Sequence, residues 1–187
     1  MKKRLLSCIV CICMVLCSLN AATFAKDSET VVILYENDVH CAVEGYSKLA
    51  AMKNELKSEY EYVGVVSSGD FVQGGTLGAV SKGEYIVELM NLVGYDAIAL
   101  GNHEFDWGED YISANASLAK FPMLAINIYE KSTNKQVDYA QSSVIVECNG
   151  LQVGIIGAAG DNYSSISSDK VEDVYFKTGS QLTALVK

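Results

Sequence analysis

Three short polar segments of the sequence carry side chains that can bind metal ions. ENDVH contains Asp38 and His40, SSGDFVQGG contains Asp70, and LGNHEFDWG contains Asn102 and His103. Carboxylate, amide and imidazole groups are ligands for ions such as Zn²⁺, Mn²⁺ or Fe, and a carboxylate shared between two ions holds them about 3.5–4 Å apart. The three segments together predict a site for two divalent metal ions.

Each segment alone also fits a simpler interpretation, because Asp-x-His, Gly-Asp and Asn-His-Glu all occur in ordinary turns. Their combination matters because each one follows a predicted strand. In open α/β sheets the loops at the carboxyl ends of the strands converge on one crevice. We therefore expect the five side chains to meet there, with Asp70, from the middle strand of the three, as the bridging carboxylate.

The rest of the chain alternates between strand and helix patterns. Runs rich in β-branched residues are typical of buried strands, and apolar residues at helical spacing indicate helices with one buried face. Strands are predicted at residues 30–37, 62–69, 95–101 and 121–129, and helices at 46–60, 82–94 and 109–120. This alternation predicts an α/β fold, with βαβ units and a mostly parallel sheet covered by helices.

The pattern changes after residue 140. Two strand-like runs within residues 142–159 flank Asn149-Gly150, which is a strong signal for a tight hairpin turn. Residues 161–187 are polar, as expected of a solvated loop rather than a metal site. Their acidic side chains include Asp161, Asp169, Glu172 and Asp173.

The first 25 residues have the order of a secretory signal peptide. Basic residues at positions 2–4 precede an apolar run at 5–19 and small residues up to Ala25. The run is shorter than the roughly 20 residues of a spanning helix, and Leu16 before Cys17 disfavours a lipid anchor. We expect a signal peptide at 1–25, one domain at 26–187, and a secreted or periplasmic protein without a stable membrane anchor.

Charge and cysteine content narrow the possible partners. Without the expected signal peptide the chain carries 11 basic and 23 acidic residues, a net charge of about −12, which disfavours binding to a nucleic-acid backbone. Two cysteines remain, Cys41 and Cys148, too few for a disulfide framework. Export would permit a bridge between them, but we favour free thiols.

The segments ILYENDVHCAVEG, SSGDFVQGG and LGNHEFDWG, in this order and at these spacings, resemble the first half of the calcineurin-like metallophosphoesterase domain. The similarity is to the branch of secreted 5′-nucleotidases and 2′,3′-cyclic-nucleotide phosphodiesterases, and is clearest over residues 30–160. It implies the first half of a four-layer α/β domain, and a hydrolase whose substrate is a nucleotide or another small phosphate ester.

The resemblance also implies a set of metal ligands. Asp38 and His40 would bind the first ion, Asp70 would bridge, and Asn102 would bind the second ion. The two divalent ions expected for the family are Zn, Mn, Fe or Mg.

The resemblance implies roles other than metal binding for the neighbouring residues of the third segment. His103 would act on the phosphate as general acid or transition-state stabiliser, and Asp106 would orient its ring. Glu104 would be structural, at the start of a helix.

The histidine count leaves two functional interpretations open. The family completes its metal site with histidines from later Gly-His and Gly-His-x-His loops, whereas this chain has two histidines, both already assigned. The first ion would then lack one family ligand and the second ion two. The chain is either the N-terminal part or a shortened form of a metal-dependent phosphohydrolase, or a non-catalytic truncated remnant that binds metal or phosphate weakly.

Overall fold

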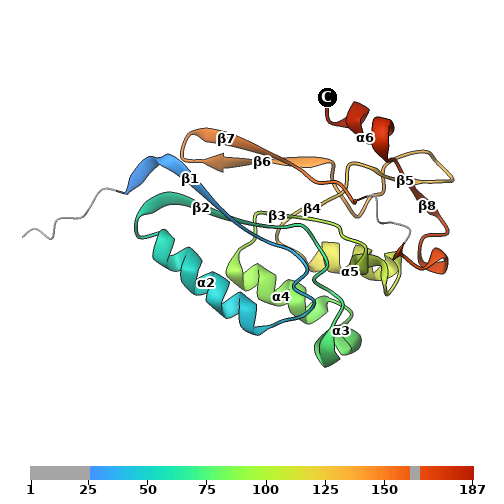
Figure 1. Ribbon diagram of the computed structural model, residues 1–187, viewed down its shortest axis with the longest axis horizontal. Coiled ribbons are helices and arrows are strands. Elements are labelled where there is room, and N and C mark those ends of the chain that lie inside the picture. Colours follow the sequence, from blue (N-terminus) through green and yellow to red (C-terminus); the bar gives the residue numbers. More distant parts are fainter. Residues whose placement is uncertain (1–25, 161–164) are drawn as a thin grey trace, which may run out of the picture.

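A parallel four-stranded sheet forms the centre of the computed structural model, which describes residues 26–160 and 165–187 (Figure 1). The strand order is β1-β2-β3-β4, and each neighbouring pair is parallel. The strands are β1 (Asp27–Glu36), β2 (Tyr60–Ser67), β3 (Ala97–Ala99) and β4 (Met123–Leu124). The expected signal peptide and Asp161 lie outside the described residues.

Helices connect the parallel strands. They are α2 (Glu44–Leu56), α3 (Gly75–Ser81), α4 (Glu84–Val93) and α5 (Glu109–Leu118), with the short 3₁₀ helix η1 (His103–Phe105) after β3. Figure 1 shows α2 and α4 on the same side of the sheet, as right-handed crossovers between strands in sequential order require. The α/β fold predicted from the alternating pattern is confirmed.

Helix α4 shows how the apolar pattern builds the core. Ile86, Val87 and Met90 lie on one face of the helix and are fully buried, because this spacing repeats about once per turn. Gly94 ends the helix in a left-handed conformation (φ 78°), which is common for a glycine that follows the last turn of a helix. The buried Lys53 of α2 donates hydrogen bonds to the carbonyls of Val93 and Gly94 and so fastens the two helices together.

Two antiparallel pairs follow the parallel sheet. Strands β6 (Ser143–Cys148) and β7 (Leu151–Ile156) form the predicted hairpin. Asn149 (φ 50°) and Gly150 (φ 84°) are both left-handed, as a two-residue hairpin turn requires. Strand β5 (Ile128–Glu130) pairs with β8 (Val174–Phe176).

The structure corrects the sequence prediction in three places. Helix α3 was not predicted, because two of its seven residues are glycines, which are poor helix formers. The single strand expected at 121–129 is divided into β4 and β5. The expected loop near the C-terminus contains the 3₁₀ helix η3 (Ser168–Lys170), strand β8 and helix α6 (Gly179–Leu185).

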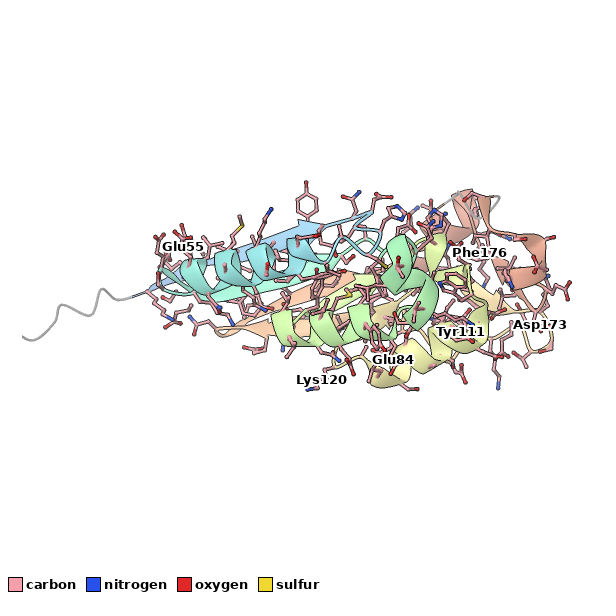
Figure 2. All side chains as sticks on the ribbon, turned by 90° about the horizontal axis from the view of Figure 1, so that it is seen from below. Glu55, Glu84, Tyr111, Lys120, Asp173 and Phe176 are labelled. Carbon is pink, nitrogen blue, oxygen red and sulfur yellow. The ribbon has the colours of Figure 1, made fainter. Side chains whose placement is uncertain are left out.

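The two ends of the molecule are formed by different parts of the chain. Figure 2, which looks onto the helices, shows Glu55 of α2 at one end and Asp173 and Phe176 at the other.

Cys41 and Cys148 are both buried and unbridged. None of the helices within residues 26–160 and 165–187 has both the length and the apolar character needed to cross a lipid bilayer.

Candidate metal centre

The register of the sheet brings the three polar segments to one edge. Glu36, at the end of β1, pairs with Ser67, at the end of β2, and Ser67 pairs with Ile98 of β3. The loops that follow these strands therefore start side by side. Because parallel strands present their carboxyl ends at the same edge, the convergence follows directly from the topology.

Backbone hydrogen bonds hold the first two loops together. The N–H of Asp38 donates to the carbonyl of Gly69 (3.2 Å), and the N–H of His40 donates to the carbonyl of Asp70 (3.0 Å). Asp38, His40 and Asp70 all have positive φ angles, of 53°, 47° and 60°. Such conformations cost of order 1–3 kcal/mol each and cluster at functional sites, where they aim side chains at a ligand.

The side chains of His40, Asp70 and His103 form a cluster. One possible ligand atom from each lies within 4.8 Å of those of the other two, and the two imidazole rings are 5.0 Å apart between centroids. Asp38 borders the cluster, with its Oδ1 3.7 Å from Nε2 of His40. Asn102 directly precedes His103, at the N-cap of η1, and is partly buried.

Gln73 fixes the ring of His40, a contact that the sequence analysis missed. Its Oε1 lies 2.8 Å from Nδ1 of His40, so the Nδ1–H form of the ring donates there and keeps the Nε2 lone pair available. Gly74 makes this approach possible, since a Cβ there would lie 2.2 Å from the carbonyl oxygen of His40. The only sequence signal for this contact was the glycine-rich loop that contains Gln73.

Asp106 and Asp70 hold His103 from two sides. Nδ1 of His103 is 2.9 Å from Oδ2 of Asp106. The backbone N–H of His103 donates to Oδ1 of Asp70 (2.8 Å). Burial lowers the pKa of His103, but the hydrogen bond and charge of Asp106, helped by the nearby carboxylates of Asp70 and Glu104, outweigh this effect. The pKa of His103 is therefore raised above 6.5.

We expect Asp106→Asn to lower the pKa of His103, because asparagine keeps an acceptor and removes the charge. The NMR titration of the His103 ring in the metal-free chain measures this, with Asp110→Asn on α5 as the control. Because the pKa of His103 is higher in the folded chain than in the unfolded chain, protonation of this ring stabilises the fold. The stabilisation is complete below about pH 6.5 and is lost as the pH rises through the folded pKa. An unchanged pKa in Asp106→Asn would contradict the assignment.

Glu104, for which a structural role is predicted, lies in η1, and its contacts reach beyond the start of that helix. Its side chain is 3% exposed and accepts hydrogen bonds from the backbone N–H groups of Asp70, Phe71 and Gly101. Burial raises the pKa of Glu104 to about 7, although these N–H groups favour the charged form. The carboxylate therefore connects two of the three loops at the site.

The acidic residues near the C-terminus lie in a separate hollow. Asp169, Glu172 and Asp173 share it with Glu109 and Asp110 of α5, around a volume of about 270 Å³. The hollow is lined by residues 107–111, 169–170 and 172–173, whereas the cluster forms on the loops that follow β1, β2 and β3.

Comparisons with known proteins agree with this geometry. Residues 31–178 match the family described as Calcineurin-like phosphoesterase. The chain is 33% identical over 156 residues to the snake venom 5′-nucleotidase of Gloydius brevicauda, covering 73% of the chain and 26% of that protein. It is 30% identical over 184 residues to the protein UshA of Escherichia coli (strain K12), covering 91% and 33%.

Solved structures show the same fold. The 5′-nucleotidase precursor from Thermus thermophilus superposes with a TM-score of 0.73 at 23% identity, covering 83% of this chain and 34% of that one. The NAD nucleotidase of Haemophilus influenzae gives a TM-score of 0.70 at 25% identity, covering 83% and 31%. The chain thus spans about a quarter to a third of the length of these four relatives.

Proposed function

Because the chain belongs to the calcineurin-like phosphoesterase family, we propose that it serves the metal-dependent hydrolysis of a nucleotide phosphate ester. The observation that carries this proposal is the cluster of His40, Asp70 and His103 at the converging strand ends. The substrate class is inferred from relatives named 5′-nucleotidase, among them one to which the chain is 33% identical.

We assign the metal ligands to the residues of the three loops. Asp38 and His40 would hold the first ion, Asp70 would bridge, and Asn102 would hold the second. The donor set suits divalent ions, because it combines carboxylates with an imidazole whose Nε2 is left available by the contact of Nδ1 with Gln73. Bound ions would neutralise phosphate charge and activate a water molecule.

His103 is assigned to the proton transfer. Asp106 engages its Nδ1, which leaves Nε2 to face the substrate, and the raised pKa favours the protonated ring. An imidazolium at this place can donate a proton to the leaving oxygen of the ester. Asp106 would act through His103, by holding its ring.

One observation favours a second candidate, in which these residues bind metal or phosphate without turnover. The chain contains two histidines, and both lie in the cluster. No further histidine is left to bind an ion, so the first ion has three proposed ligands, Asp38, His40 and Asp70. The second ion has two, Asp70 and Asn102. This second candidate predicts weak metal binding by the chain, chiefly at the first position, and hydrolysis near background.

Phosphate release from a nucleoside monophosphate, with Mn²⁺ or Zn²⁺ and with a chelator, tests the proposal. Asp70→Ala and His103→Ala are compared with Asp138→Ala, whose carboxylate is exposed on another surface. Turnover that both site variants eliminate supports catalysis, and a preference over a simple alkyl phosphate supports the nucleotide class. Metal or phosphate binding without turnover supports the second candidate, and no binding of either contradicts both.

A further inference from the structure

A single buried carboxylate joins two of the loops that carry the proposed ligands. Oε2 of Glu104 accepts hydrogen bonds from the backbone N–H groups of Asp70 (2.9 Å) and Gly101 (2.6 Å). Its Oε1 accepts one from the N–H of Phe71 (2.9 Å). The loop after β2 and the loop after β3 are therefore held by one side chain that is 3% exposed.

The two loops are also packed at backbone distance around this carboxylate. A Cβ at Gly69 would lie 2.3 Å from the N atom of Gly101, and a Cβ at Gly101 would lie 2.3 Å from Oδ1 of Asp70. The same Oδ1 accepts the N–H of His103. A movement of either loop away from Glu104 would therefore change the position of the Asp70 carboxylate relative to His103.

We propose that Glu104 is a positioning residue that fixes Asp70 relative to the Asn102-His103 pair before any ion binds. The inference rests on the proposed function, because the ions are what these ligands would hold. Groups that orient metal ligands typically change metal affinity by 10–100-fold when removed, although they do not touch the metal. Glu104 would act in this way through the backbone of the ligand-bearing loops.

A carboxylate suits this role better than an amide. In its charged form, which the three N–H donors favour, Glu104 has two oxygens with no attached hydrogen that can accept all three N–H groups at once, and hydrogen bonds to a charged acceptor are the stronger ones. Glutamine has nearly the same shape, but it would direct its NH₂ group at one or more of the three N–H donors. Glu104→Gln therefore weakens the connection between the two loops with little change in packing.

The first measurement is amide hydrogen exchange by NMR in the metal-free chain, which does not depend on the proposed function. We expect Glu104→Gln to speed the exchange of the Phe71 and Gly101 amides by about 10-fold or more. The amide of Val65 in β2, which donates to Oδ2 of Asp96 (2.7 Å), should be unaffected. Glu109→Gln is the matched control, since this half-buried carboxylate accepts from the Tyr139 hydroxyl and not from either loop.

The second measurement is the affinity for Mn²⁺ alone, by calorimetry. We expect Glu104→Gln to weaken Mn²⁺ binding by about 10-fold or more, and Glu109→Gln to leave it unchanged. Faster loop exchange without a loss of Mn²⁺ affinity would overturn the positioning role. So would unchanged loop exchange, or a rise at Val65 as large as that at Phe71, because Glu104 would then stabilise the fold in general.

The two proposals can fail separately. A wild-type chain that binds no Mn²⁺ would defeat the proposed function. The exchange of the Phe71 and Gly101 amides in the metal-free chain would still decide whether Glu104 fixes the loops.

Discussion

Asp70→Asn is expected to lower the affinity of the chain for Mn²⁺ by about 100-fold or more. Removing a residue that only orients a metal ligand typically costs 10–100-fold, and Asp70 is the proposed ligand shared by both ions. Asparagine has the shape of aspartate but no charge, so the attraction for a divalent ion falls while the packing is preserved. Calorimetric titration with Mn²⁺ measures the change, and Asp138→Asn, on an exposed loop, is the control.

The same substitution separates charge from loop geometry. Oδ1 of Asp70 accepts the backbone N–H of His103, and the Oδ1 of asparagine can accept it as well. We therefore expect the amide spectrum of the metal-free Asp70→Asn chain to resemble the wild type outside the residues next to position 70. Mn²⁺ affinity equal to that of Asp138→Asn would show that the ion binds elsewhere.

The convergence of the site residues could be predicted because it depends on topology. Asp38, Asp70 and Asn102 each come within three residues of a strand end, and parallel strands end at the same edge of the sheet. Strand type and order were readable from apolar runs and from the helical spacing between them. The positions of the ligand loops then followed without knowledge of any side-chain contact.

The contacts that orient the ligands could not be predicted, because no periodic pattern encodes them. Gln73 meets His40 from a different loop, 33 positions away, and Glu104 meets Phe71 at the same separation. Both depend on loop paths that need left-handed backbone at several non-glycine residues. Strand β8 was missed for a related reason, since its three residues acquire their structure by pairing with β5.

Gly69→Ala is expected to lower the free energy of unfolding by about 3 kcal/mol. A residue with φ 97° lies where side chains are rarely tolerated, and the added Cβ would be 2.3 Å from the Gly101 nitrogen and 2.8 Å from the Ala99 carbonyl oxygen. Overpacking of this kind costs about 1–3 kcal/mol, and an unfavourable positive φ adds about 1–2 kcal/mol. Both contacts are with backbone, so no side-chain rotation can relieve them.

Urea denaturation followed by circular dichroism measures this loss, and Gly154→Ala in β7 is the matched control. A Cβ at Gly154 would meet nothing within 4 Å, so its effect should stay within about 0.5 kcal/mol. The methyl group at position 69 would also lie 2.9 Å from Oε2 of Glu104, at the junction between the two loops. Mn²⁺ affinity should therefore fall together with stability in Gly69→Ala. Equal stability of the two alanine variants would mean that these loops are further apart in solution. Close packing of the loops would then no longer support the proposal that Glu104 connects them.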